Sequence, residues 1–134
     1  MRRVRLFVTP APHGGWEELT DGGRRPVRVA ATDLQHARRV RARVRAEADD
    51  VAVILDVTVA VAADFRSARA DLQSADGVRY GGTVDGLAGL LADIELAEVA
   101  DGVTLVPASP RDDVHALGRA VLHRLALRAQ QAAS

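Results

Sequence analysis

The chain has 134 residues, 48% of them hydrophobic and 27% charged, and its 18 basic and 18 acidic side chains cancel to a formal net charge of zero. This length fits one domain with its own hydrophobic core, and the balanced charge gives no electrostatic preference for nucleic acids or anionic membranes. Because the chain has no cysteine and every basic residue apart from histidine is arginine, disulfides, thiolate chemistry and lysine-based catalysis are excluded.

The apolar segments predict neither a secretion signal nor a membrane anchor. The first twelve residues lack the long apolar core and the cleavage pattern of a signal peptide. No run approaches the roughly 20 apolar residues of a membrane span. We therefore expect a cytoplasmic protein that has neither a membrane nor a nucleic acid as its partner.

Two strands and a long loop are expected in the first 31 residues. Residues 3–9 alternate and are rich in β-forming residues, and a second, short strand is expected at residues 26–31. Residues 10–25 lie between them and carry two Gly-Gly pairs, so we expect a long loop there. A loop of this length in a compact domain is usually functional or partly disordered.

Helices and strands alternate along the rest of the chain. Thr32, with Gln35 three residues later, is typical of a helix start, and this helix would bury one side formed by Leu34, Ala37, Val40, Val44 and Ala48. The almost continuously apolar residues 51–61 predict a strand that is buried on both faces. A further helix is expected at 65–75, with Asp64 as its cap.

The last third of the chain repeats this alternation. A short strand or turn at residues 78–82 precedes a helix at about 84–97, for which Thr83 is the expected cap. A strand is expected at 102–106, followed by a helix from Ser109, its cap, to about residue 129. Residues 130–134 are expected to form a disordered tail.

This order of elements predicts a single α/β domain over residues 1–134, with a mostly parallel sheet and alternating helices. Ligand sites in such folds lie beyond the carboxyl ends of the strands. Candidate binding residues are therefore sought in the loops that follow the strands.

The loop at residues 10–25 contains the first candidate site. His13 and Trp16 lie close together in this loop, and a tryptophan near a histidine can line a pocket for a substrate. The alternative is that Trp16 covers the edge of the core while His13 is solvated.

The segment YGGTVDGLAG, residues 80–89, contains the second candidate site. Backbone amides at Gly82 and Thr83 could bind a cofactor phosphate at the start of the following helix. Leu87 and Ala88 stand where a P-loop requires lysine and Ser/Thr. The alternative, a turn followed by a threonine-capped helix, needs no ligand.

Asp56 lies within the apolar strand, and Asp49 and Asp50 come just before it, which resembles the phosphoryl-acceptor site of receiver domains. In receivers, however, the acidic pair follows the first strand, and the chemistry needs a lysine. We therefore expect Asp56 to be partly buried beside a local partner.

Arginines and histidines give no further site. Arg38, Arg39, Arg43 and Arg45 fall mostly outside the apolar side of their helix, which predicts a solvated face rather than a nucleic-acid interface. The histidines lack the spacing of two ligands of one metal on a helix. We expect no metal site.

Four stretches together resemble the C-terminal part of the luciferase-like family of flavin- or deazaflavin-dependent monooxygenases and reductases. They are LFVTP followed by DLQHARRVRARVRAE, then VAVILDVTVAVAADFRSARADL, RYGGTVDGLAGLL and DGVTLVPASPRDDVHALGRAVLHRL. The third is similar to the family's Gly-Thr-Pro-x-x-(Val/Leu)-Ala helix start, with Gly82 and Thr83 in place. Val84 stands where the family has proline, and Gly86 where an acidic residue is common.

The resemblance implies a partial TIM barrel, because 134 residues are too few for eight βα units. It also makes flavin mononucleotide (FMN) or the deazaflavin F420 the cofactor to expect, if one binds. The matching positions Gly82, Thr83, Asp101, Gly102 and Pro107 are mainly structural in the family. The family's catalytic groups lie in strands that have no counterpart here, so no catalytic residue is carried over.

These observations lead to three functional hypotheses. The first is a stand-alone luciferase-like fragment that is not catalytic alone and acts as a homo-oligomer or with a partner chain. The second is a flavin- or deazaflavin-dependent oxidoreductase whose site is rebuilt on oligomerisation. The third is a regulatory module that binds a small molecule without redox chemistry.

Overall fold

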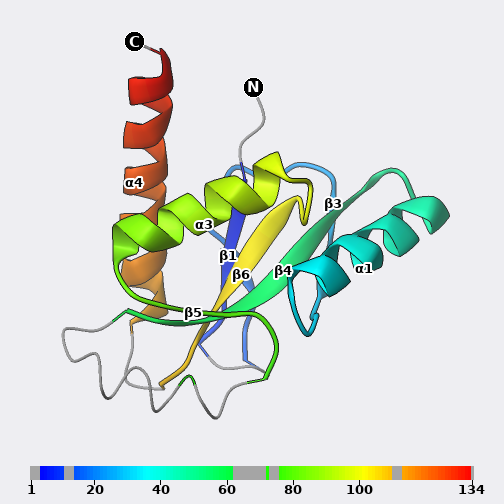
Figure 1. Cartoon of the computed structure of the whole chain (residues 1–134), viewed down its shortest axis with the longest axis horizontal. Coiled ribbons are helices and arrows are strands. Elements are labelled where there is room, and N and C mark those ends of the chain that lie inside the picture. The colour runs from blue at the N-terminus through cyan, green and yellow to red at the C-terminus, as the bar shows by residue number, and fades with distance from the viewer. Residues whose placement is uncertain (1–3, 11–13, 62–71, 73–75, 110–112, 134) are drawn as a thin grey trace.

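The computed structural model describes residues 4–10, 14–61, 72, 76–109 and 113–133. The predicted α/β class is confirmed, since a curled half-barrel sheet carries three helices in this part of the chain (Figure 1). The elements are β1 (Arg5–Val8), β2 (Glu17–Glu18), β3 (Arg25–Val29), α1 (Leu34–Glu47), β4 (Val51–Ala60), β5 (Arg79–Gly81), α3 (Val84–Leu96), β6 (Gly102–Pro107) and α4 (Val114–Ala133).

The sheet is organised around β4 and β6, in the order β2-β1-β6-β4-β3. β6 pairs in parallel with both β1 and β4, and β4 also pairs in parallel with β3 and β5, whereas β2 is antiparallel to β1. β3 pairs with the first half of β4 and β5 with its last three residues, so these two strands follow one another along the same edge of β4. This central position explains why eight of the ten residues of β4 are buried.

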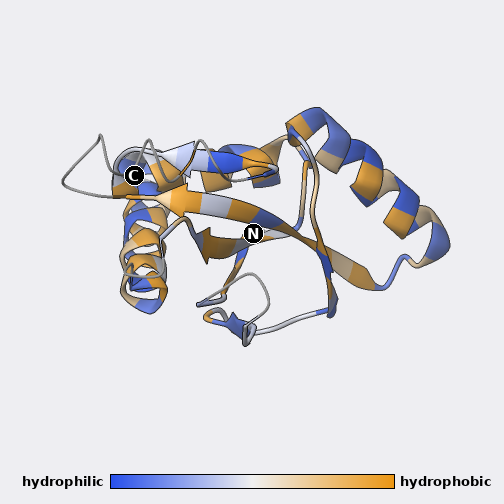
Figure 2. Cartoon of the chain, turned by 90° about the horizontal axis from the view of Figure 1, so that it is seen from below, coloured by the Kyte–Doolittle hydropathy of each residue, from blue (hydrophilic) through white to orange (hydrophobic). Residues whose placement is uncertain are grey.

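Helices α1, α3 and α4 pack on one side of the sheet and cover the main core (Figure 2). Alternate residues of each strand point toward them, because successive side chains of a strand project from opposite faces. The fully buried side chains of this core include Leu6, Val8, Leu55, Val57, Leu87, Leu91, Val103, Leu105 and Val121. Among the described residues, no helix is both long enough and apolar enough to cross a membrane.

The opposite side of the sheet, called the inner face here, carries a smaller apolar cluster. Phe7, Ala52 and Ile54 are buried there, and Trp16 packs against them from the segment between β1 and β3. The register places Phe7 level with Thr104 and Asp56, so these three side chains project on the same face.

Two predicted features differ from the structure at the starts of helices. The cap of α1 is Asp33 rather than Thr32, because the Asp33 carboxylate accepts the backbone N–H of His36 at 2.7 Å. α4 begins at Val114 and not near Ser109, since Asp113 accepts the N–H of Ala116 at 3.0 Å. Aspartate and threonine or serine are all good caps, so composition alone does not choose between neighbouring candidates.

Two predicted irregular segments contain regular structure. Within 10–25, β2 pairs antiparallel with the end of β1. The last helix continues through Ala133, where a tail from residue 130 was expected. The helix predicted at 65–75, with Asp64 as its cap, lies almost wholly outside the described residues.

The carboxylate of Asp101 joins three elements at the amino ends of the central strands. One oxygen accepts from Nε and Nη2 of Arg41 at 3.3 and 3.1 Å, and the other accepts the backbone N–H of Val53 at 2.8 Å. Arg45 completes the cluster at 3.6 Å from the second oxygen. Arg45 was expected on the solvated side of its helix, but it points inward because it also donates to the carbonyl of Val51 at 3.1 Å.

Replacing Asp101 should therefore destabilise the fold. We expect Asp101→Ala to lower the free energy of unfolding by about 2–3 kcal/mol, because two guanidinium groups and the Val53 N–H lose their acceptor. Asp101→Asn should cost less, since an amide oxygen can still accept the Val53 N–H. Urea unfolding measures both, with the exposed Asp50→Ala as a control expected within about 0.5 kcal/mol of wild type. Equal stabilities of Asp101→Ala and Asp50→Ala would contradict this role.

Candidate functional site

The segment with Gly82 and Thr83 forms the start of α3. Thr83 is the N-cap, as predicted, and its hydroxyl accepts the backbone N–H of Gly86 at 3.0 Å. The N–H of Gly82 donates to the carbonyl of Ala60 at 3.2 Å, which ties the turn to the end of β4. Two of the amides in this segment are therefore used within the protein.

The Tyr80 side chain occupies the space that the glycines leave. A Cβ on Gly82 or on Gly86 would overlap the Tyr80 hydroxyl, which donates to the carbonyl of Thr83 at 2.9 Å. The Gly82 backbone also has φ +152°, a conformation that favours glycine. The absence of a Cβ at Gly82 and Gly86 thus leaves room for the Tyr80 side chain in this turn. The spacing of the glycines alone does not reveal this role.

An acidic side chain already stands at this helix start. Asp85 lies in the first turn of α3, where a carboxylate interacts favourably with the helix dipole. Arg128 of α4 approaches Asp85 at 3.8 Å. An incoming phosphate would meet the Asp85 charge, so the geometry favours the threonine-capped helix over a phosphate site. Binding of a cofactor by Gly82 and Thr83 stays a prediction.

His13 lies outside the described residues, so of the two residues predicted in the long loop the structure describes Trp16. Its indole stacks on the ring of Phe7 with centroids 4.5 Å apart and planes at 16°. Its Nε1 donates to the hydroxyl of Thr104 at 2.9 Å, across 88 residues of sequence. Trp16 is half-buried, so part of this fixed aromatic surface faces out from the inner face.

Two ion pairs flank the aromatic surface on the inner face. Arg28 of β3 donates to Asp56 of β4 at 2.8 Å, which confirms the expected local partner of Asp56. Arg5 of β1 donates from Nε and Nη2 to the two oxygens of Glu18, at 2.9 and 2.7 Å. The inner face therefore combines one aromatic stack with paired charges.

The Arg5–Glu18 pair shifts both ionisation equilibria. The hydrogen bonds from Arg5 lower the pKa of Glu18, and those same bonds raise the pKa of Arg5. Thr20 adds a hydrogen bond to the Glu18 carboxylate. A second contact, between His115 Nε2 of α4 and Glu17 at 2.6 Å, holds the other side of β2. Both contacts fix the segment that carries Trp16.

The amino ends of the strands form a charged hollow that the sequence did not suggest. Its volume is about 250 Å³, and it lies between α1, the start of β4 and the end of α3. Its lining includes both arginines and acids, among them Arg41, Arg45, Glu95 and Asp101. The arginines are far from the acids in sequence, and no local motif joins the two groups.

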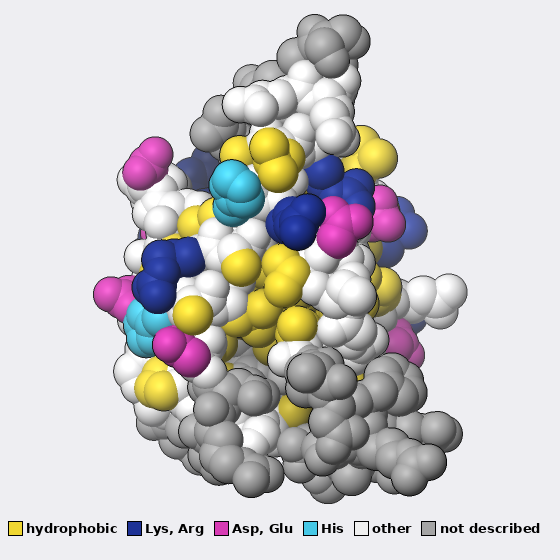
Figure 3. Space-filling model, turned by 90° about the vertical axis from the view of Figure 1, so that its left-hand side faces the viewer, with side chains coloured by type: hydrophobic (Ala, Val, Ile, Leu, Met, Phe, Trp, Pro, Cys, Tyr) yellow, Lys and Arg dark blue, Asp and Glu magenta, His cyan; other side chains and the backbone are white. Residues whose placement is uncertain are grey.

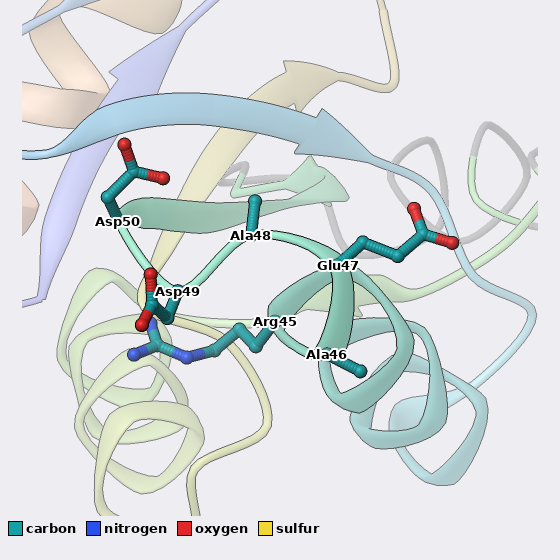
Figure 4. A pocket seen from close by; sticks show the side chains of 6 residues that line it. All are labelled: Arg45, Ala46, Glu47, Ala48, Asp49 and Asp50. Atoms are coloured by element: carbon teal, nitrogen blue, oxygen red, sulfur yellow. The ribbon is translucent and has the colours of Figure 1, made fainter.

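A second, open depression of about 560 Å³ lies at the turn from α1 to β4 and shares Arg45 with the hollow. Figure 4 shows that its side chains do not converge, since those of Glu47 and Asp50 lie at opposite ends of the turn. Asp49 and Asp50 lie here, before β4, so they are not the acidic pair of a receiver site. No group of three or more potential metal ligands occurs in the described part of the chain.

No family model matches the chain, and no curated protein matches it either. The luciferase-like resemblance and its cofactors therefore stay predictions.

The Arg5–Glu18 pair predicts a pH dependence of stability. Because the folded-state pKa of Glu18 is lowered, its contribution is complete above the ordinary glutamate pKa of about 4.3 and is lost as pH falls through the folded-state pKa. We expect Glu18→Gln to lower the free energy of unfolding at neutral pH by about 1 kcal/mol. The difference from wild type, measured by urea unfolding between neutral pH and about pH 3, should shrink with acidification. A difference that is the same at every pH would contradict the assignment.

Proposed function

We propose that this chain is a luciferase-like partial-barrel module that is not catalytic alone and acts as a homo-oligomer or together with a partner chain. The observation that carries the proposal is that few residues of helix α1 are buried. Of its 14 residues only Ala37 is buried, whereas Val40 and Val44 are half-buried and Leu34 is 36% exposed.

A second element leaves apolar surface uncovered near the same end of the sheet. Leu96, the last residue of α3, is 85% exposed. Single exposed apolar residues are common on protein surfaces, but an amphipathic helix with so little burial is typical of a surface that another chain covers. The luciferase-like resemblance adds the expectation that the chain is part of a larger barrel architecture.

The proposal predicts concentration-dependent self-association or stable association with a second polypeptide. Size-exclusion chromatography with light scattering, at loading concentrations from about 1 to 100 µM, measures the mass of the purified chain. We expect the mass to exceed that of one chain of 14.2 kDa over this range. A monomer that melts cooperatively and shows no concentration dependence would argue against the proposal.

A second candidate function is a flavin or deazaflavin site on the inner face. It is favoured by the Trp16–Phe7 stack, whose orientation is fixed by the hydrogen bond from Trp16 to Thr104. A flat aromatic ring system can extend such a stack, and the fixed indole loses little conformational freedom on binding.

Trp16 is the only tryptophan of the chain, so its fluorescence reports on this surface alone. We expect saturable quenching on titration with FMN or F420, because a bound flavin ring would lie against the indole. N-acetyltryptophanamide titrated in parallel corrects for light absorbed by the ligand. Thr104→Val, which removes the acceptor of the indole N–H, should weaken the binding. Quenching no greater than that of the free amide would leave this function without support.

A further inference from the structure

The segment of residues 14–20, called the Trp16 segment here, projects its side chains to two sides of the sheet. Trp16 and Glu18 point to the inner face, where they contact side chains of β1. Glu17 and Leu19 point the other way, toward α4 and the main core. This alternation is that of an extended strand. The segment therefore joins the inner face to the helix-covered face, beside the outer edge of β1.

Helix α4 packs closely against the Trp16 segment at a glycine. A Cβ on Gly118 would overlap Cδ1 of Leu19 and would lie 3.1 Å from Cγ1 of Val8. The absence of that Cβ lets the helix backbone approach both the segment and β1. Leu19 is also held by the sheet, since its N–H donates to the carbonyl of Leu6 at 2.8 Å.

The contact between His115 and Glu17 lies at the surface, three residues before Gly118. The His115 Nε2 and Glu17 Oε2 atoms are 2.6 Å apart, and the two side chains are 43% and 61% exposed. Histidine and acidic side chains lie side by side on the face over α4 that Figure 3 shows. Protons therefore reach this imidazole from solvent without any opening of the fold.

The charges near His115 come from β2 and from α4 itself. Glu17 faces the imidazole from β2. Asp113 lies two residues before His115 and caps the helix, whereas Arg119 lies one turn after it and disfavours a second positive charge. The charged residue of β1, Arg5, lies on the inner face. Glu17 is thus the carboxylate that a protonated His115 contacts.

We propose that the contact between His115 and Glu17 is a pH-sensitive switch, which holds the Trp16 segment in place more firmly when His115 is protonated. Histidine side chains gain their charge as pH falls from about 8 to about 5. A charged imidazole attracts the Glu17 carboxylate, whereas a neutral one offers only a weaker hydrogen bond. The switch needs neither a second chain nor a bound ligand.

Loosening of this contact changes the inner face, because Glu17 is covalently next to Trp16. When the segment leaves β1, Trp16 loses its stack on Phe7 and its hydrogen bond to Thr104. The aromatic surface of the inner face is therefore completed most often in mild acid and least often above neutral pH.

The second ion pair of the Trp16 segment keeps its charge over the same pH range. The hydrogen bonds from Arg5 lower the pKa of Glu18, so Glu18 stays ionised at and above about pH 5. A change in the opening of this segment between about pH 5.5 and about pH 7.5 therefore reports the protonation of a histidine.

Hydrogen exchange at the backbone amide of Leu19 measures how often the segment opens, because this N–H is bonded to the Leu6 carbonyl. NMR gives its protection factor at about pH 5.5 and about pH 7.5, after correction for the intrinsic exchange rate. We expect protection about two- to fivefold greater at the lower pH, the range of an exposed ion pair. The amide of Ala48, which opens by local fraying at the end of α1, should show equal protection at both pH values.

Two substitutions and a matched control identify the histidine. His115→Gln and Glu17→Gln should each remove the difference between the two pH values, because each keeps a hydrogen-bonding side chain and removes one charge. His123 is an exposed histidine two turns further along α4, and no ion pair joins it to another described residue. His123→Gln should therefore keep the wild-type difference.

Each outcome supports or overturns the proposal. Equal protection of Leu19 at both pH values in the wild-type chain overturns it. A difference that persists in His115→Gln overturns it too, because the proton then acts at another histidine. A change at Ala48 as large as that at Leu19 would show that pH acts on the whole fold rather than on this segment, which also contradicts the switch.

Discussion

The structure depends on one carboxylate, that of Asp101, at the point where the two central strands begin. It binds the backbone of β4 through Val53 and two guanidinium groups of α1, while its own N–H donates to the Val53 carbonyl at 2.8 Å. These bonds fix where β6 enters the sheet beside β4, and hence the register of every residue on both faces. The orientation of α1 follows from the same contact, because Arg41 and Arg45 reach inward to it rather than to solvent. The ion pairs of Asp101 thus position α1, because too few apolar side chains of this helix are buried for packing alone to position it.

The fold class could be read from the sequence because its strongest signals are local. The run VAVILDVTVA can only be buried on both faces, and the structure places it beside β6 on one edge and β3 and β5 on the other. Thr83 was identified as a cap since it immediately precedes a regular apolar pattern. Asp33 and Asp113 were missed because Thr32, one residue earlier, and Ser109, four residues earlier, are also good caps. β2 was also missed, because it is only two residues long and so shows no periodicity. It is a strand because it pairs with β1.

The candidate sites were harder to predict, because they combine residues that are distant in sequence. Trp16 was singled out, but its partner Thr104 lies 88 residues away. Gly82 and Thr83 suggest a phosphate site, but their spacing does not reveal that the Tyr80 hydroxyl fills the space that the neighbouring glycines open. The charged hollow draws on the segment before β3, on α1 and on the end of α3. The residues from Asp85 to Asp101 include acids and no basic residue, but this pattern does not indicate which distant arginines complete the hollow.

The strand order sets a sequence of events for a chain that emerges from the ribosome. β3 and β4 are neighbours both in the sheet and, apart from α1, along the chain, so they can pair early. β1 precedes the other strands along the chain, but its parallel pairing requires β6, which begins at Gly102 and is made much later. Until then, β1 can pair only with the two-residue strand β2, and contacts of such long separation as those with β6 form slowly. The insertion of β6 between β1 and β4 is therefore the step that closes the sheet, and newly made chains are most exposed to aggregation just before it.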